Sequence, residues 1–473
     1  MTSTSAQTQP ASPDASRGEA EVWQGVRNMV GQAARVSLGG ASTTLLRNDP
    51  CAWPDLLAKC KFAQKVLGEG RRVLHLGAGD GLGSAVLTEF TADYLGVDAD
   101  AVAVADAQAA WGEDGRRFEA GSLDVARPGF DGVVDLAAPL EAEALGARLS
   151  AIAGSLGAGG LAVVGAEITG PASAARLREA VASRFRHVLP FSLHEDRVLA
   201  GCRGDEGYAL LVAAAPLPVG AAARGEEAVS RGGSGSVGAK NDRLSFGPFW
   251  SYVARRTPRR LLYTMAYYRF AARLIGGGSF GQASKRVLDV GCGEGGGTHL
   301  MAQACGSALG VDFDEDSIAA AQRNWPEASG SDRQVHSSNP PHARLRFACE
   351  DLHRVEAGGF DAVVNFDVVE HLQPESAASF FRGMAERLGP RGMAVVGTPN
   401  VTSKVYANAV TNAGHINLYD GPGLRSAMAE AFEYAFLFGA NDEVVHTGFP
   451  PMCHYLIAVG LGPKRAAAQS AAG

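Results

Sequence analysis

The chain has 473 residues, of which 46% are hydrophobic and 20% charged, so it can bury a full core and is long enough for two or three domains. Its formal net charge of −7 disfavours nonspecific nucleic-acid binding, which usually needs a basic surface. Seven scattered cysteines, none in a C-x-x-C pair, indicate reduced thiols, and no apolar run is long enough for a transmembrane helix. We therefore expect a cytoplasmic protein without a membrane span, while peripheral membrane contact and the oligomeric state stay open.

The first part of the chain, residues 1–50, is predicted to be a disordered tail followed by a helical leader. Residues 1–16 are rich in Ser, Thr, Gln and Pro and have no apolar segment, so they do not resemble a signal peptide. A leader helix is expected at about residues 21–36. A further helix is expected at residues 55–67, where it leads into the first buried strand.

A glycine-rich loop occurs twice, each time after an apolar strand and before a helix-like stretch. The loops read VLHLGAGDG and VLDVGCGEG and begin at Val73 and Val287. Each is followed by a second apolar strand that ends in GVD, and the spacing from the first loop glycine to the final acid, Asp98 or Asp312, is the same in both copies. Strand, glycine turn, helix, strand and terminal acid are typical of a β-α-β nucleotide-binding unit.

The repeat continues beyond the loops and predicts a duplicated α/β domain. FDGVV at residue 130 matches FDAVV at residue 360, and LGAGGLAVVG at residue 156 matches LGPRGMAVVG at residue 388. Between the copies the composition shifts to Pro, Gly, Ala and Ser, which is typical of a flexible linker. The expected parts after the leader are a first copy, a linker and a second copy, at residues 51–215, 216–240 and 241–465.

Three features of the second copy go beyond a general dinucleotide-binding unit. Asp289 lies inside the first strand, Glu350 and Asp351 follow the third strand, and the domain ends in two strands joined by a loop, at about 434–438 and 454–459. With the glycine loop, these features make residues 285–460 resemble the class I S-adenosylmethionine-dependent methyltransferases. The resemblance implies two Rossmann-like methyltransferase domains, each a mostly parallel seven-stranded sheet with flanking helices. A Rossmann-type domain that binds another nucleotide, or none, is the alternative.

The resemblance implies S-adenosyl-L-methionine as the cofactor and assigns its contacts. The loop glycines would pass beneath the methionine part, and Asp289 would anchor its ammonium group through the loop. Asp312 would hold the ribose, Asp351 the adenine amino group, and Asp367 begins the segment that passes under the sulfonium. The expected cofactor residues are Asp289, Gly291, Gly293, Gly295, Asp312, Asp351 and Asp367.

The segment DVVEH, residues 367–371, follows the fourth strand and carries the expected catalytic groups. Its Glu370-His371 pair resembles the acid-histidine pair of ubiquinone-biosynthesis O-methyltransferases. A histidine there can take the proton of a hydroxyl during methyl transfer because its pKa lies near working pH, and His415 in a later loop is a rival base. Helix capping is the alternative role for His371. Members of that subgroup can also use a metal, so a metal ligand is the alternative role for Glu370. The Asp, Glu and His of the loop at residues 441–448 lack a known metal spacing, and no metal site is expected.

Substrate contacts are expected from loops at the carboxyl end of the sheet and from a basic aromatic helix. Asn400 follows the fifth strand, and His446 lies in a polar loop before the last strand. Arg255 and Arg259 lie in the helical segment before the second copy, where guanidinium groups can pair with a phosphate or carboxylate. A packing helix with a solvated basic face is the alternative.

The first copy keeps the glycine loop and Asp98 but loses the other features. His75 stands where the second copy has Asp289, Ser122 aligns with Asp351, and AAPLE at residue 137 aligns with DVVEH. It is therefore expected to be a structural or regulatory pseudo-domain that still has the elements to bind cofactor. A second methyltransferase with a different base is the alternative.

The predicted function is methyl transfer by the second copy to a hydroxyl-rich small molecule, a sugar nucleotide or a glycan. The second copy is also similar to bacterial methyltransferases that modify surface or flagellar glycans, and the polar loops favour such an acceptor. Methylation of protein or RNA is the first alternative, although no nucleic-acid partner is expected. A non-catalytic tandem scaffold that senses cofactor is the second alternative, and the intact Asp351, Glu370 and His371 argue against it.

Overall fold

The computed structural model describes residues 19–31, 33–194, 197–200, 202, 207–217, 243–276, 284–326 and 344–465. Its contacts divide the chain into two compact units. The first-copy unit comprises residues 34–266 and 323–325, and the second-copy unit comprises residues 1–33, 267–322 and 326–473. Helix α9 (Arg259–Gly276) has residues in both. The predicted linker, apart from Pro216 and Leu217, and the predicted tail at residues 1–16 lie outside the described residues.

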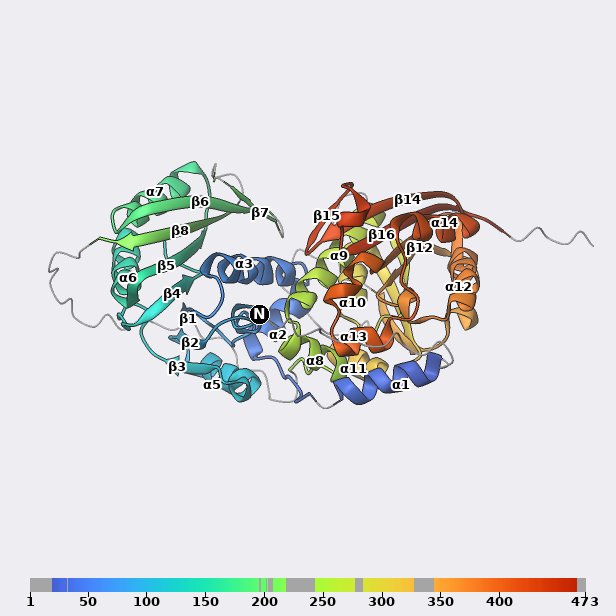
Figure 1. The fold of residues 1–473 in the computed structure, drawn as a ribbon, viewed down its shortest axis with the longest axis horizontal. Helices are drawn as coiled ribbons and strands as arrows, with labels where there is room; N and C mark the ends of the chain where they lie inside the picture. Colours follow the sequence, from blue (N-terminus) through green and yellow to red (C-terminus); the bar gives the residue numbers. More distant parts are fainter. Residues whose placement is uncertain are drawn as a thin grey trace, which may run out of the picture. The chain divides into compact units, whose positions relative to one another are not determined.

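The first-copy unit alternates strands and helices and then ends in an antiparallel segment (Figure 1). Its elements in chain order are α2 (Gly40–Asn48), α3 (Ala52–Leu67), β1 (Arg72–Leu76), α4 (Ser84–Leu87), β2 (Asp93–Asp98), α5 (Ala101–Trp111), η1 (Gly112–Asp114), β3 (Arg117–Ala120), β4 (Phe130–Asp135), α6 (Ala142–Ser155), β5 (Leu156–Glu167), α7 (Pro171–Ala182), β6 (Phe185–His194), β7 (Arg197–Ala200), β8 (Tyr208–Pro216) and α8 (Pro248–Arg256).

The second-copy unit repeats this alternation and adds one helix from the start of the chain. Its elements, besides its part of α9, are α1 (Glu19–Val30), β9 (Lys285–Val290), α10 (Gly296–Cys305), β10 (Gly306–Asp312), α11 (Glu315–Asn324, whose last residues group with the other unit), β11 (Arg344–Cys349), η3 (Leu352–Arg354), β12 (Phe360–Phe366), η4 (Val369–His371), α12 (Pro374–Arg387), β13 (Leu388–Pro399), η5 (Val401–Tyr406), α13 (Ala409–Gly414), α14 (Gly421–Ala431), β14 (Phe432–Asn441), β15 (Val444–His446), η6 (Pro450–Met452) and β16 (Tyr455–Pro463).

The two sheets have the same strand order. It is β3-β2-β1-β4-β5-β8-β6-β7 in the first-copy unit and β11-β10-β9-β12-β13-β16-β14-β15 in the second. Five strands of each sheet are parallel, and the last three pair antiparallel. The predicted α/β class with two Rossmann-like sheets is confirmed. Each sheet has one short strand, β7 or β15, beyond the seven expected, because the loop before the last strand folds back and pairs with β6 or β14.

The core of the second-copy unit lies between the sheet and the helices α12 and α14, which cover one of its faces (Figure 1). Phe381 and Met384 of α12 and Met428 of α14 are at most 1% exposed and belong to one apolar cluster with Val363 and Val396 of the central strands. Central parallel strands are covered on both faces, so their sequences are continuous apolar runs. This core fixes the carboxyl ends of β9, β10, β12 and β13, from which the site loops leave.

The division into units differs from the predicted boundaries at two places. The leader contains α1, which ends at Val30 and groups with the second copy, followed by α2, which groups with the first. Residues 243–266, expected to open the second copy, group with the first, where Phe246 stacks on Trp53 with parallel rings 6.0 Å apart. The order of the sequence did not reveal that α1 groups with the second copy or that residues 243–266 group with the first, because both groupings depend on packing. Among the helices of the described residues, none has both the length and the hydropathy of a bilayer span.

Candidate active site in the second copy

The site lies at the carboxyl ends of the parallel strands of the second-copy unit. β9 pairs with β10, the next strand in sequence, along one edge. It pairs with β12, a later strand, along its other edge. Ligands of open α/β sheets bind where the strand order reverses in this way, since the loops on the two sides diverge there. The glycine loop follows β9 and the DVVEH segment follows β12, so the fold brings both predicted motifs to this point.

The glycine loop is held open by its backbone. Gly291, Gly293 and Gly295 have φ angles of 73°, 51° and 83°, in the left-handed region that favours glycine. A Cβ on Gly295 would lie 2.6 Å from the ring of Phe347, whereas a Cβ on Gly293 would meet no atom within 4 Å. The loop therefore packs tightly at its end and leaves free space at its middle, which fits a cofactor that approaches the backbone closely.

Asp312, at the end of β10, links the glycine loop to the next strand. The Gly293 N–H donates to its Oδ2 at 2.9 Å, and the Asp314 N–H donates to its Oδ1 at 2.9 Å. Burial raises the pKa of Asp312 to about 6, against the opposing effect of these two hydrogen bonds. Asp351 follows β11 as expected, where its side chain accepts the His353 N–H at 2.7 Å and caps η3. Both acids thus lie in the loops that the fold class uses for a nucleoside.

Asp289 is fully buried and contacts two helices. Its carboxylate accepts the Tyr268 hydroxyl of α9 at 3.0 Å and the Thr298 hydroxyl in the first turn of α10 at 2.6 Å. Burial raises its pKa to about 7, although both hydrogen bonds favour the charged form. Asp289 therefore fixes the helix that follows the glycine loop. Its role in anchoring the methionine ammonium group stays a prediction. Sequence reasoning did not identify Tyr268 or Thr298, although a buried acid always requires donors nearby.

The DVVEH segment turns sharply at its first residue. Asp367 has a φ of 58°, an uncommon conformation for a residue other than glycine, and its N–H donates to the Gly397 carbonyl at 3.0 Å. Backbone strain of this kind is concentrated at functional sites, because it re-aims the residues that follow. Here it leads directly into η4, which carries Glu370 and His371.

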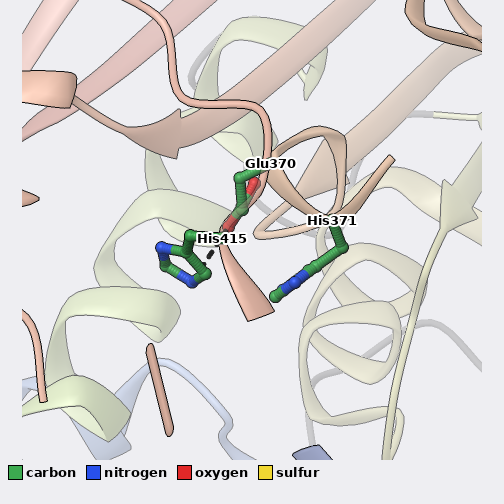
Figure 2. Close-up of side chains that lie close together, drawn as sticks. All are labelled: Glu370, His371 and His415. Atoms are coloured by element: carbon green, nitrogen blue, oxygen red, sulfur yellow. Dashed lines mark ion pairs between the residues drawn. The ribbon is translucent and has the colours of Figure 1, made fainter. Parts of the chain in front are cut away.

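Glu370, His371 and His415 form one cluster (Figure 2). Glu370 is 0% exposed, and its Oε2 accepts the Thr398 hydroxyl at 2.9 Å. His415 is 7% exposed, and its Nε2 lies 4.0 Å from Glu370 Oε1. His371 is half-buried, and its ring centre lies 5.0 Å from that of His415. The main-chain oxygen of Glu370 accepts the N–H groups of residues 416 and 417, which fixes the His415 loop on η4.

The His371 ring is oriented by a backbone carbonyl. Its Nδ1 lies 2.8 Å from the Gly414 oxygen. Because a carbonyl only accepts, Nδ1 must donate, and a neutral His371 then has its lone pair on Nε2. The sequence identified both histidines, but it did not reveal that they would lie face to edge beside one buried acid.

The same three residues are the one candidate metal cluster among the described residues, with one ligand atom from each within 4.8 Å of the others. Zinc ligands lie about 2.0–2.2 Å from the ion. The cluster would therefore have to contract to hold one. The expectation of a site without metal stays a prediction.

The predicted substrate residues lie outside this cluster. The Asn400 amide donates to the main-chain oxygens of Pro450 and Cys453, at 2.9 and 2.8 Å, and is 1% exposed. His446 lies on β15, and its Nδ1 accepts the Gly448 N–H at 3.0 Å. For Asn400, these contacts support a structural role, since the amide is occupied within the protein. A role in substrate binding stays a prediction for both.

Arg255 and Arg259 group with the first copy. Arg255 donates to the main-chain oxygens of residues 34, 35 and 110, and Arg259 pairs with Glu89 at 2.6 Å. These contacts agree with the alternative of a packing helix and give no support to a role at the second-copy site.

The first copy retains part of the same geometry. The Gly79 N–H donates to Asp98 Oδ2 at 2.8 Å, as in the second copy, and a Cβ on Gly79 would meet no atom within 4 Å. His75 replaces the buried acid, and its Nδ1 lies 2.9 Å from the Tyr94 hydroxyl oxygen. Burial lowers the pKa of His75 to about 4, so the ring is neutral near pH 7. The first copy thus keeps the contact between its glycine loop and Asp98, while the acid-histidine pair is missing.

Asp289 gives a testable pH dependence of stability. Its pKa is raised from 3.8 to about 7 in the folded protein, so the folded state binds the proton more tightly than the unfolded chain does. This contribution to stability is present below about pH 4 and is lost as pH rises toward 7. We expect Asp289→Asn, which has no charge to bury, to gain stability relative to wild type across that window. Thermal unfolding midpoints of both proteins from pH 4 to pH 8 measure this, with the exposed Glu356→Gln as control. If the difference in unfolding midpoint between wild type and Asp289→Asn stayed constant with pH, the predicted pH dependence would be wrong.

Comparison with known proteins agrees with this geometry. A family model described as "Methyltransferase domain" matches residues 256–433. Over 170 residues the chain is 28% identical to a probable S-adenosylmethionine-dependent methyltransferase of Mycobacterium tuberculosis, a match that covers 36% of this chain and 53% of the relative. Over 136 residues it is 33% identical to the ubiquinone biosynthesis O-methyltransferase of Aromatoleum aromaticum, which covers 29% of this chain and 53% of that protein.

A solved TehB-like methyltransferase from Corynebacterium glutamicum is 18% identical, with a TM-score of 0.30, and the match covers 42% of this chain and 87% of the other. The chain spans about half the length of the curated relatives it matches. The family-model match covers the glycine loop, Asp312 and the DVVEH segment, which the structure brings to one edge of the sheet. Residues 256–433 are therefore similar to a methyltransferase domain and to S-adenosylmethionine-dependent methyltransferases.

Proposed function

We propose that the second copy transfers the methyl group of S-adenosylmethionine to a hydroxyl oxygen of a small, hydroxyl-rich acceptor. The observation that carries this proposal is the fixed orientation of His371, which leaves Nε2 able to accept a proton beside the DVVEH turn. The similarity to ubiquinone biosynthesis O-methyltransferases supports oxygen as the acceptor atom. Sugar nucleotides and glycans fit the same chemistry.

When bound, S-adenosylmethionine supplies a methyl group activated by its sulfonium sulfur. The glycine loop and Asp312 would hold the cofactor, and the loops after β12 and β13 would hold the acceptor oxygen close to its methyl group. His371 Nε2 would take the proton that the acceptor hydroxyl loses when it is methylated. Water exclusion and orientation by the surrounding loops provide the rest of the acceleration.

His371 is a better candidate base than His415. His415 is 7% exposed and lies against the buried Glu370, whereas His371 is only half-buried. A base must come within hydrogen-bond reach of its substrate proton. We assign Glu370 and His415 to positioning: Glu370 joins η4 to β13 through Thr398, and His415 packs against the His371 ring.

We expect His371→Gln to lower kcat on the order of 10²–10⁴-fold, because a positioned general base contributes about that much. His415→Gln should lower kcat less, and the exposed His187→Gln in the first copy should leave it unchanged. The assay is release of S-adenosylhomocysteine with a panel of hydroxylated acceptors, including catechols and sugar nucleotides. Losses under about threefold in both site variants would rule out base catalysis and leave proximity alone. Activity confined to a peptide or an RNA would overturn the acceptor class.

Removal of metal ions tests whether the activity requires one. With His371 as the base, dialysis against EDTA should leave kcat within about twofold of its starting value. Loss of activity that Mg²⁺ or Zn²⁺ restores would instead make Glu370, His371 and His415 ligands.

We propose that the first copy has a structural or regulatory role. It keeps the hydrogen bond between Gly79 and Asp98, but Leu140 and Glu141 occupy the positions aligned with Glu370 and His371. A domain of this kind can bind cofactor without transferring its methyl group.

Calorimetric titration of S-adenosylmethionine into the full chain tests the roles of the two copies. Because Asp312 orders the second loop and is expected to accept ribose hydroxyls, Asp312→Ala should abolish the binding associated with turnover. Asp98→Ala should remove a second binding event, if one is seen, and leave turnover unchanged. Turnover that depends on Asp98 would contradict the proposed division of roles. No binding to the wild-type chain would overturn the proposed function as a whole.

A further inference from the structure

The first helix of the chain packs on the site of the second copy, although the whole first copy separates them in sequence. α1 belongs to the second-copy unit and lies beside α11 and α13 (Figure 1). Val22, Val26 and Val30 are at most 6% exposed and recur every four residues, which gives the helix one apolar face. Val26 lies where a Cβ on Gly414 would come within 3.1 Å of it, so α1 contacts the residue whose carbonyl orients His371.

Trp23 connects the two ends of the site. Its ring meets the His371 ring edge to face, with centres 5.9 Å apart, and meets the Phe313 ring in the same way at 5.7 Å. His371 is the proposed base, and Phe313 directly follows the ribose acid Asp312. Phe313 is 62% exposed despite this contact, so much of an aromatic ring beside the nucleoside loop is left uncovered. Aromatic pairs of this geometry stabilise a fixed arrangement beyond simple burial.

Arg27 holds α1 on the nucleoside side. Its guanidinium group pairs with Asp314 at 2.9 Å and also with Asp316. Asp314 is almost buried and caps the start of α11 through Ser317, so its position is fixed independently of α1. α1 therefore contacts the loop after Asp312 through Arg27 and Trp23, and the base cluster through Trp23 and Val26.

We propose that α1 is a cover of the cofactor site in the second copy, with Trp23 as a positioning residue for His371. This inference rests on the proposed function. A helix of 12 residues is marginally stable without its packing surface. α1 can therefore leave the site to let cofactor in and product out, and it closes again when a bound nucleoside adds contacts at Phe313. The segment before the first copy thus completes the active site of the second.

Hydrogen exchange of the full chain, with and without S-adenosylhomocysteine, tests the cover directly. We expect the backbone amides of α1 to exchange several-fold more slowly with the ligand, and those of α7 in the first copy to be unaffected. Asp312→Ala should abolish the protection. Unchanged exchange in α1, in a wild-type protein that calorimetry shows to be saturated, would overturn the cover and leave the proposed function intact. No binding at all would overturn the proposed function and this inference with it.

Variants of α1 test the positioning role. Trp23→Ala should weaken S-adenosylhomocysteine binding about tenfold and shift the His371 ring-proton resonance, which is identified by its loss in His371→Gln. Trp23→Phe should largely restore both, since it keeps an aromatic ring. Arg27→Glu, which faces Asp314 and Asp316, should weaken binding without removing the ring. Glu21→Ala, on the exposed side of the same helix, is the matched control. Wild-type affinity and an unmoved His371 resonance in Trp23→Ala would overturn the role, and unfolding midpoints exclude loss of the fold.

Discussion

The buried carboxylate of Asp289 is the interaction on which the second-copy site depends. It ends no strand and faces no solvent, yet it accepts hydroxyl groups from α9 and from the first turn of α10. A carboxylate in an apolar interior is tolerated only when its oxygens are bonded. The requirement therefore fixes both helices against β9, and with them the glycine loop between β9 and α10. The raised pKa of this group records the cost of burial.

The first copy shows what happens to this arrangement when the acid is replaced. His75 and Tyr94 form a neutral buried pair, and the glycine loop keeps its contact with Asp98. At the end of β4, Asp135 pairs with Arg148, where the second copy has Asn365 and then the turn at Asp367. The first copy thus satisfies its buried polar positions with different pairs of residues. It retains no acid-histidine pair. Its fold is preserved because the apolar strands, not the site residues, determine the sheet.

The site itself is assembled from distant segments. η4 brings Glu370 and His371, the loop after α13 brings His415, and α1 brings Trp23. Each joins the cluster through backbone or ring contacts: the Gly414 carbonyl orients His371, and the Glu370 carbonyl holds the following loop. The cluster that holds the proposed base is therefore in contact with a helix from near the start of the chain.

The sequence alone determined the α/β class, the repeated strand-loop-helix pattern, the glycine loops and the acids at the strand ends. These are local patterns, since alternating apolar runs, left-handed glycines and strand-terminal acids each follow from a few adjacent residues. It also gave His371 and His415 as candidate bases, and that role stays a prediction. Only the tertiary structure decided that these two histidines share one buried acid, that Asn400 is used within the protein, and that Arg255 and Arg259 pack with the first copy. It also decided that α1, which precedes the first copy in sequence, packs on the second copy. Such outcomes depend on contacts between residues that lie far apart in sequence. No local pattern specifies against which apolar surface a helix will pack.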